Sequence, residues 1–505
     1  KCSCEKSATN NKTKQEDKNF ILFPIPDNIH PYQFVSKVKL STIFILYTPM
    51  IHKHQSVLLS CLVLALLVTG CKDDKPIEPD DKTKEATAHI AVNNWLYEVM
   101  EDGYYWYKDM PIKNSLVTAS DPFDFFEKLV YKRSTTDRFS MVTDDVNALQ
   151  NEFDGISKVF GIQYQVAFLD DAKKDVGLFL NMVVKGSPSE AAGLKRGDII
   201  VKINGTSLTT DNYGKLLTGL NTAEFTLASL NADHTYTENS TKISVSRAEV
   251  TEDPVVFSSV IKKPAYGKVI GYLVYSQFIP GTTAENKKYD NHLRSIFSDF
   301  KSQGVNELVL DLRFNPGGYL SSAETLGSLI GKHVSSSKVF YKEEWNDKYV
   351  KYWKEKNGAN ALNYNFLDES GNIGVHLNRV IVLTSNATAS CSELIINGLK
   401  PYMSGITIGE HTAGKDLFGS LIDDKSKKWN WGVYLMLGKT VNANNDSNYG
   451  TIDGITPDHL VKDDVIPYKP FGDEEETLMK KALEVLGIPV TTPAARQKPN
   501  MKVKP

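Results

Sequence analysis

Strands and helices alternate through the second half of the chain, and this alternation constrains the fold more than any other feature. Apolar, strand-like segments lie at 269–275, 307–312, 380–383 and 406–408, with a helix expected through 292–300. Such alternation is typical of an α/β domain, which we place at 251–488. The 505 residues leave room for about three domains in all.

A second segment places a strand, a short helix and a tight turn in close succession. Residues 187–193 combine an N-cap serine, a proline at the first helical position, a capping-box glutamate and a terminal glycine. Strand-like residues precede this helix, and a strand with an Asn-Gly turn follows it. This order resembles a PDZ domain, which we place at 155–250.

A PDZ domain implies peptide binding, in which an extended peptide is added as a strand at a sheet edge. The matching loop here contains Phe160, Gly161 and Ile162, so these residues are the expected peptide-binding site. A module of this shape can also serve only as a structural spacer, and we favour peptide binding.

A small helical domain is expected at 85–150, because apolar residues recur there with helical spacing. Between its two apolar groups, residues 104–107 form an aromatic cluster. We favour packing of this cluster between helices over a role in substrate binding.

The sequence ahead of these domains resembles an export signal. Residues 50–70 contain a short positive region and about a dozen apolar residues, too few for a membrane-spanning helix. They end in Val-Thr-Gly before Cys71, similar to the lipobox of bacterial lipoproteins, so Cys71 is the expected lipidation site. Residues 1–49 are interpreted as a non-native upstream extension, and 71–84 as a polar linker.

These features predict an exported bacterial lipoprotein of the outer membrane, on its periplasmic or cell-surface face. The chain has 58 Lys and Arg against 61 Asp and Glu, a balance that disfavours a nucleic-acid partner. Three of the five cysteines precede the cleavage site, so Cys71 and Cys391 remain and no disulfide is expected. Residues 489–505 are expected to form a disordered tail.

Two turns carry the first signs of chemistry. After the strand at 307–312, residues 313–318 read Arg-Phe-Asn-Pro-Gly-Gly, and the glycines Gly317 and Gly318 can expose backbone N–H groups to an oxyanion. Ser390 lies at a strand-to-helix corner, where a helix N-terminus also stabilises negative charge. Ser390 and Glu393 equally match a capping box, so this segment alone leaves both readings open.

Lys415 ends a glycine-flanked loop that follows the strand at 406–408. A lysine takes a proton from a serine hydroxyl only if burial lowers its pKa from about 10.4 towards neutrality. The loop also matches the start of a phosphate-binding P-loop, but the next residue is Asp416, where magnesium coordination needs Ser or Thr.

Together these motifs resemble the C-terminal processing peptidases, or tail-specific proteases. The resemblance rests on Asp-Leu-Arg-x-Asn-Pro-Gly-Gly at 311–318, Thr-Ala-Ser-x-Ser-Glu at 388–393, Thr-x-Gly-Lys at 412–415 and Gly-Ile-x-Pro-Asp at 454–458. It implies a serine endopeptidase that acts on protein or peptide substrates. It also implies a multidomain α+β fold with an N-terminal helical domain, a PDZ-like β domain and an α/β catalytic domain.

The resemblance assigns Ser390 as nucleophile and Lys415 as general base. Gly317 or Gly318 and the backbone of Cys391 would form the oxyanion hole. Glu393 would cap the helix, and Thr412 would hold the lysine amine in line.

One departure concerns the residue that orients the lysine. Many members carry a Gln four residues after the lysine, where this chain has Gly419. Cys391 is not expected to be the nucleophile, because its side chain should point away when Ser390 points in. No metal or other cofactor is expected, and the alternative function is a non-catalytic peptide-binding lipoprotein on the same scaffold.

Overall fold

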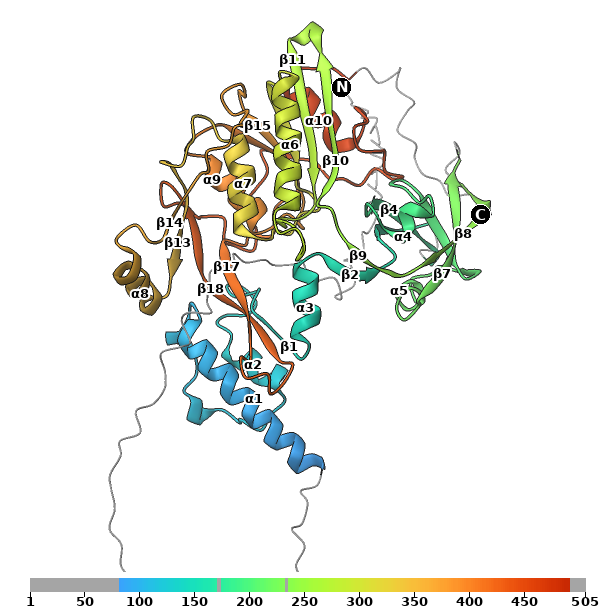
Figure 1. The fold of residues 1–505 in the computed structure, drawn as a ribbon. Helices are drawn as coiled ribbons and strands as arrows, with labels where there is room; N and C mark the ends of the chain where they lie inside the picture. The colour runs from blue at the N-terminus through green and yellow to red at the C-terminus, as the bar shows by residue number, and fades with distance from the viewer. Residues whose placement is uncertain (1–80, 170–173, 232–234, 491–505) are drawn as a thin grey trace, which may run out of the picture.

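Three parts follow one another along the chain. The computed structural model describes residues 81–169, 174–231 and 235–490. Figure 1 shows N-terminal helices at one end, a strand-rich part to one side and a larger α/β part at the opposite end. The expected multidomain α+β architecture is confirmed.

Several expectations concern residues outside the described part of the chain. They are the upstream extension at 1–49, the signal peptide at 50–70, lipidated Cys71, most of the linker and nearly all of the tail. Among the residues that are described, no helix combines the length and apolar character needed to cross a membrane.

The N-terminal part is helical because its apolar residues share one face and its helices are capped. Asp121 accepts hydrogen bonds from the N–H groups of Phe123 and Asp124, and Pro122 occupies the first position of α2. Phe125 and Phe126 are then buried in the common core. The elements are α1 (Asp81–Gly103), two 3₁₀ turns (Tyr107–Asp109 and Lys113–Ser115), α2 (Pro122–Leu129) and α3 (Val146–Phe153).

The aromatic cluster at 104–107 packs against the rest of the protein, as favoured from sequence. Tyr104 is fully buried and its hydroxyl donates to Asp137 at 2.6 Å. Trp106 stacks on Tyr131 with ring centroids 5.7 Å apart.

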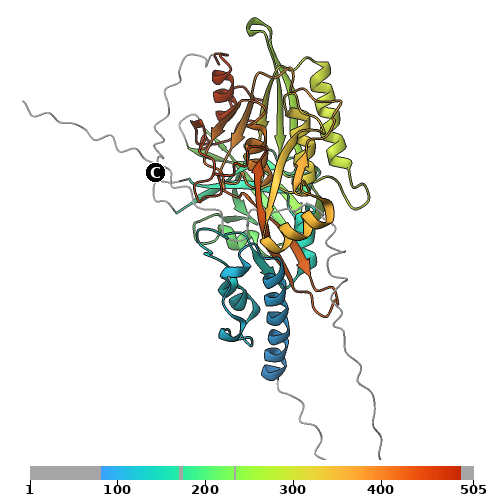
Figure 2. The same cartoon turned by 90° about the vertical axis from the view of Figure 1, so that its left-hand side faces the viewer.

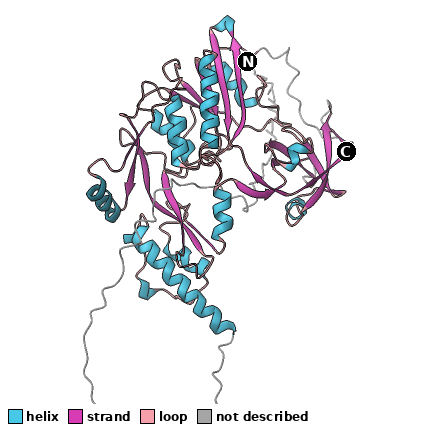
Figure 3. Ribbon diagram, viewed as in Figure 1, coloured by secondary structure: helices cyan, strands magenta, loops and turns pink. Residues whose placement is uncertain are grey.

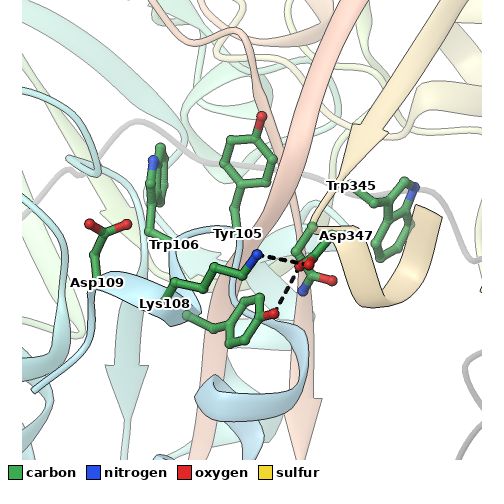
Figure 4. A pocket seen from close by; sticks show the side chains of 8 residues that line it. Tyr105, Trp106, Lys108, Asp109, Trp345 and Asp347 are labelled. Atoms are coloured by element: carbon green, nitrogen blue, oxygen red, sulfur yellow. Dashed lines mark hydrogen bonds and ion pairs between the residues drawn. The ribbon is translucent and has the colours of Figure 1, made fainter. Parts of the chain in front are cut away.

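Beside this cluster, Lys108 Nζ and the Tyr107 hydroxyl each lie 2.8 Å from the Asp347 carboxylate, joining the N-terminal part to α8 (Asp347–Asn357). A shallow cavity of about 330 Å³ opens at this seam, lined by residues 105–109 and 345–347 (Figure 4). None of the expected catalytic residues lines this cavity.

The regular structure of the second part is mostly strand (Figure 3). Its main sheet has the order β3-β4-β5-β7-β8, so β3 is an edge strand within the described residues. The strands are β2 (Ile156–Val159), β3 (Ile162–Phe168), β4 (Val176–Val183), β5 (Ile199–Ile203), β6 (Thr206–Ser207), β7 (Thr222–Leu230), β8 (Tyr236–Ser246) and β9 (Ala248–Thr251). Two short helices, α4 (Pro188–Ala191) and α5 (Tyr213–Leu217), complete it.

The short helix read from the sequence is present as α4. Ser187 accepts the N–H of Glu190 at 3.3 Å, as an N-cap residue does. The Glu190 carboxylate binds the N–H of Gly186 at 2.7 Å, whereas a standard capping box would use the N–H of Ser187. Both expected residues therefore cap the helix, but Glu190 binds the N–H group one residue before the expected one.

The third part is built on a sheet of order β10-β11-β12-β15-β16-β19. β10 is antiparallel to β11, and the following pairs are parallel. Buried side chains on one face pack against α10, and those on the other face join the core formed with α6, α7 and α9. The bounds are β10 (Val255–Lys263), β11 (Lys268–Tyr275), α6 (Lys288–Ser302), β12 (Glu307–Asp311), α7 (Leu320–Ile330), β15 (Val380–Thr384), α9 (Cys391–Leu399), β16 (Gly405–Gly409), β19 (His459–Leu460) and α10 (Thr477–Val485).

A smaller antiparallel sheet connects the N-terminal and α/β parts. Its long strand β18 (Gly432–Asn442) pairs with β17 (Leu417–Asp423), with β13 (Val339–Trp345) and with β1 (Met141–Thr143), and β14 (Asn363–Asn365) extends β13. Because β1 pairs Met141 with Tyr434, a strand of the N-terminal part completes this sheet. The perpendicular view keeps α1 at the far end of the molecule (Figure 2).

Candidate active site

Ser390 lies at the corner between β15 and α9. Its backbone has φ 56° and ψ −113°, a conformation that a non-glycine residue rarely adopts. The preceding turn is fixed to the neighbouring strand end, since the hydroxyl of Thr388 donates to the carbonyl of Leu312 at 2.8 Å. Strained backbone of this kind is concentrated at functional sites, so the corner is a candidate catalytic position.

The two glycines after β12 face this corner. Gly317 has φ +108°, and a Cβ at this residue would lie 2.7 Å from Ser390 Cβ. Only glycine fits so close an approach. The N–H of Gly317 donates to Asn315 Oδ1 at 2.9 Å.

Within the described residues, the N–H groups of Gly318 and Cys391 have no hydrogen-bond partner. Of the two glycines expected to supply an oxyanion donor, Gly318 is therefore the one whose N–H is available.

Lys415 is buried between the two sheets, with 1% of its surface exposed. Its Nζ lies 3.3 Å from the Tyr434 hydroxyl and 5.5 Å from the centroid of the Phe139 ring. Burial lowers the pKa of Lys415 to about 7, against the opposing influence of Cys391, Glu393 and Asp137. A neutral amine is therefore available near neutral pH.

The Glu393 carboxylate ties the serine corner to the lysine loop. One oxygen accepts the N–H groups of Ser390 and Lys415, at 2.9 and 2.8 Å. The other accepts the hydroxyl of Thr412 at 2.5 Å and the N–H of Gly414 at 2.7 Å. Glu393 thus caps α9 as expected and also fixes the relative position of the two candidate catalytic residues.

The structure brings Ser390, Lys415, Glu393, Gly317, Gly318 and Cys391 together, but it gives Thr412 a different position from the one expected. The Thr412 hydroxyl donates to Glu393 and accepts the N–H of Ile455 at 2.7 Å, so it does not hold the lysine amine. Among the described contacts, the hydrogen bond of that amine goes to Tyr434, and none joins it to Ser390.

Cys391 is a poor nucleophile in this environment. Its thiol points to the carbonyl of Gly318 at 3.0 Å, and burial raises its pKa to about 12. The group therefore stays protonated, and its backbone N–H is the part that faces the corner.

Arg313 holds the glycine turn in place through a buried ion cluster. Its guanidinium contacts Asp311, Asp463 and Glu476 at 2.6–2.8 Å. Arg196, from the strand-rich part, also reaches Glu476 at 3.1 Å. The same carboxylate thus joins the glycine turn and the strand-rich part.

Three family models match the chain. Residues 91–141 match the Peptidase S41 N-terminal domain, residues 181–229 a PDZ domain, and residues 269–461 Peptidase family S41. The last match contains the glycine turn, the serine corner and the lysine loop. The part of the chain that holds the candidate site thus matches peptidase family S41.

The chain is also similar to individual proteins. The carboxy-terminal processing protease CtpB of Bacillus subtilis is 25% identical over 342 residues, which are 68% of this chain and 60% of the relative. A carboxyl-terminal-processing protease of Picosynechococcus is 26% identical, over 60% of this chain and 64% of the relative. The chain thus spans less than two thirds of the length of these relatives.

A solved structure shares the fold. It is a Bacteroides fragilis protein assigned to the S41 proteases, with a TM-score of 0.66 and 28% identity, and the match covers 78% of this chain and 97% of that one.

The PDZ loop differs from expectation at one residue. Phe160 is 4% exposed and packs edge-on against Phe225, so its side chain belongs to the domain core. Gly161 has φ +87°, and a Cβ there would lie 2.1 Å from Ser187 Cβ. Ile162 begins the edge strand β3. The loop can therefore offer a peptide its backbone and Ile162, but not the Phe160 ring.

Sequence reasoning did not single out three residues that surround the lysine. Phe139 and Tyr434 flank the amine, and an Arg138 Nη donates to the carbonyls of Ala413 and Gly414 at 2.8 and 2.9 Å. Phe139 and Tyr434 belong to apolar or strand-like segments that resemble any core segment, so the sequence carries no signal for them. Within the described residues, no group of three or more His, Cys, Asp or Glu side chains is arranged to hold a metal ion.

Proposed function

We propose that this chain is a serine endopeptidase of the C-terminal processing type, which hydrolyses unfolded or C-terminally exposed proteins through Ser390 and Lys415. The observation that carries the proposal is the buried Lys415 amine, whose pKa burial lowers to about 7, in a loop tied by Glu393 to the Ser390 corner. Serine needs such a base because its own hydroxyl is a weak nucleophile.

In the first half-reaction the neutral Lys415 amine takes the Ser390 hydroxyl proton while Oγ bonds to the scissile carbonyl carbon. The N–H groups of Gly318 and Cys391 hold the negative oxygen that develops. The C–N bond then breaks as the Lys415 ammonium returns the proton to the leaving amine. In the second half-reaction, Lys415 removes a proton from water, whose oxygen bonds to the ester carbonyl carbon. The bond from that carbon to Oγ then breaks, the Lys415 ammonium returns the proton to Oγ, and the peptide leaves with a new carboxyl end.

The PDZ part would deliver chain ends to this site. Its edge strand β3 has one side unpaired within the described residues, as strand addition requires. Full-length Ser390→Ala protein should bind fluorescent peptides with apolar C-termini and lose affinity when the terminal carboxylate is amidated. Equal binding of acid and amide forms, or none, would leave the PDZ part as a spacer.

The central experiment follows cleavage of fluorescein-labelled casein by the full chain. Ser390→Ala and Lys415→Ala should each abolish cleavage, and the double variant should be no worse than either, because the two residues act as one unit. Wild-type activity should rise with pH through about 7 as the Lys415 amine becomes neutral. Retained cleavage by Ser390→Ala would exclude Ser390 as the nucleophile, and folded but inactive wild-type protein would favour a peptide-binding protein.

We further propose that Cys71 carries the lipid that anchors the mature protein to the outer membrane. The support is the apolar run before Val-Thr-Gly-Cys and the polar linker after it. Cys71→Ala should move the protein from the membrane fraction to the soluble fraction, and unchanged fractionation would contradict the anchor.

A further inference from the structure

The candidate base is enclosed by two aromatic residues that come from opposite ends of the described chain. Phe139 belongs to the segment that leads into β1, and Tyr434 lies on β18. The ring centroids lie 5.5 and 5.3 Å from Lys415 Nζ, and the Tyr434 hydroxyl lies 3.3 Å from it. The Lys415 amine therefore lies near two aromatic rings and makes its described hydrogen bond with one hydroxyl.

We propose that Phe139 and Tyr434 are positioning residues for the general base. The Phe139 ring keeps water away from the Lys415 amine, and the Tyr434 hydroxyl accepts one amine N–H so that the lone pair is left for the Ser390 proton. This inference rests on the proposed function, because it assigns roles around the base of that reaction.

The position of Phe139 is fixed from both sides. Asp137 Oδ1 accepts the N–H groups of Phe139 and Ser140 at 3.2 and 2.8 Å, while the Tyr104 hydroxyl donates to the other carboxylate oxygen. The Ser140 hydroxyl oxygen in turn accepts the N–H of Met436 at 3.0 Å. Phe139 is therefore held by a buried hydrogen-bond network as well as by packing.

The same strand pairing places Tyr434 opposite this segment. Met141 pairs with Tyr434 across β1 and β18, two residues after Phe139. Strand β17, which begins two residues after the lysine, offers no side chain at Gly419, because a Cβ there would lie 2.4 Å from the Met436 methyl and 2.5 Å from the Leu435 carbonyl. The neighbouring strand β18 supplies the hydroxyl.

Charged and titratable groups approach the lysine from each element packed around it. Glu393 and Cys391 on α9 and Asp137 before β1 favour the charged ammonium, whereas desolvation disfavours it and dominates. Arg138 is directed at the loop carbonyls, and Tyr434 faces the amine from β18. Since exclusion of water is the dominant influence, the residue that excludes water should control the pH profile.

The first test measures the pH dependence of kcat/KM for labelled casein with full-length Phe139→Ala. Water admitted to the cavity should move the rising limb of the pH profile at least one pH unit upwards, which lowers kcat/KM at least about 5-fold at pH 7 and leaves near-wild-type values above pH 9.5. Phe139→Leu, which keeps an apolar side chain, should retain the wild-type midpoint. If Phe139→Ala does not fold, Phe139→Val provides the same comparison with a smaller cavity.

The second test uses Tyr434→Phe, which removes only the hydroxyl. Its kcat should fall about 10-fold at every pH with KM unchanged, as expected for loss of one positioning hydrogen bond. The midpoint should stay or move to lower pH, because an accepting hydroxyl stabilises an ammonium more than an amine. The two variants thus have distinguishable signatures. Tyr341→Phe, which removes another buried tyrosine hydroxyl from the same sheet, is the matched control and should keep the wild-type kcat and midpoint.

Two results would overturn the inference. The first is that folded Phe139→Ala keeps the wild-type midpoint of the pH profile. If the alanine variant does not fold, the same result in folded Phe139→Val counts instead. The other is wild-type kcat in Tyr434→Phe, or equal losses in Tyr434→Phe and Tyr341→Phe. Failure of the proposed function gives a different result, because Ser390→Ala would then remain active or the wild type would not cleave casein at any pH.

Discussion

Replacing Lys415 with methionine should make the protein more stable and make that gain depend on pH. Burial lowers the pKa of Lys415 from 10.5 to about 7. Below pH 7 the folded protein holds a charged amine in a dry site, and the difference in pKa corresponds to a cost of about 5 kcal/mol. Methionine has a similar length and no charge, so Lys415→Met removes this cost and abolishes activity.

The sign and size of the gain follow from proton binding. Between pH 7 and 10.5 the unfolded chain binds a proton at Lys415 that the folded protein has released, so wild-type stability rises across this interval. Removal of the titrating amine should raise the free energy of unfolding of Lys415→Met above that of the wild type by about 4 kcal/mol at pH 7, by about 2 kcal/mol at pH 9 and by less than about 0.5 kcal/mol at pH 10.5. The lost hydrogen bond to Tyr434 subtracts about 1 kcal/mol at every pH.

Urea unfolding followed by tryptophan fluorescence at pH 7, 9 and 10.5 measures this difference. Ser390→Ala is the matched control, because it is equally inactive but removes no titrating group, and its stability change should be the same at each pH. A difference between Lys415→Met and the wild type that does not vary with pH would mean that the amine keeps its charge in the folded protein. Such a result would refute the argument for a neutral base.

Three further substitutions test the site and its surroundings. Gly317→Ala would place a Cβ 2.7 Å from Ser390 Cβ. Its kcat should therefore fall about 100-fold while the circular dichroism spectrum is unchanged. A wild-type kcat would show that the glycine turn can move away from Ser390. Glu393→Gln loses one of the two oxygens that together accept four hydrogen bonds. Thermal melting should show that the free energy of unfolding falls by about 3 kcal/mol, and activity should be lost as well. An active, stable variant would contradict the role of Glu393 in joining the serine corner to the lysine loop. Burial raises the pKa of Glu343 from 4.5 to about 7, so its contribution to stability is full below pH 4.5 and is lost as the pH rises through 7. Glu343→Gln should therefore gain about 3 kcal/mol over the wild type between pH 4.5 and 8.5 in urea unfolding, and a constant difference would exclude a neutral Glu343.

The sequence predicted those parts of the site that depend on local chain geometry. A glycine turn after a buried strand and a serine before a helix can be read from neighbouring residues, because strand ends and helix N-termini have characteristic patterns. The helix cap by Glu393 was expected for the same reason. The contacts of Glu393 with Gly414 and Lys415 were not expected. They join two segments that are separated in the chain by about 20 residues, including the strand β16.

The rest of the site depends on contacts that a single sequence does not contain. Phe139 and Tyr434 lie almost 300 residues apart and meet only because β1 pairs with β18. Phe160 shows a different limit: the PDZ pattern places this residue in the loop expected to bind peptides, but the burial of its side chain depends on Phe225 in a distant strand. Thr412 was expected to hold the lysine amine, but its hydroxyl contacts Glu393 and Ile455, which lie 19 and 43 residues away along the chain.

The pairing of β1 with β18 also determines when the active site can form during synthesis. Ser390 and Lys415 are made before β18, and the segment carrying Phe139 must wait for residues 432–434 before it has a strand to pair with. Contacts with such long sequence separation form late in folding, because loop closure must precede them. A growing chain therefore carries Ser390 and Lys415 before the segment with Phe139 can pair with β18 and enclose the lysine. The dry surroundings of the Lys415 amine thus depend on a strand that is synthesised after both Ser390 and Lys415.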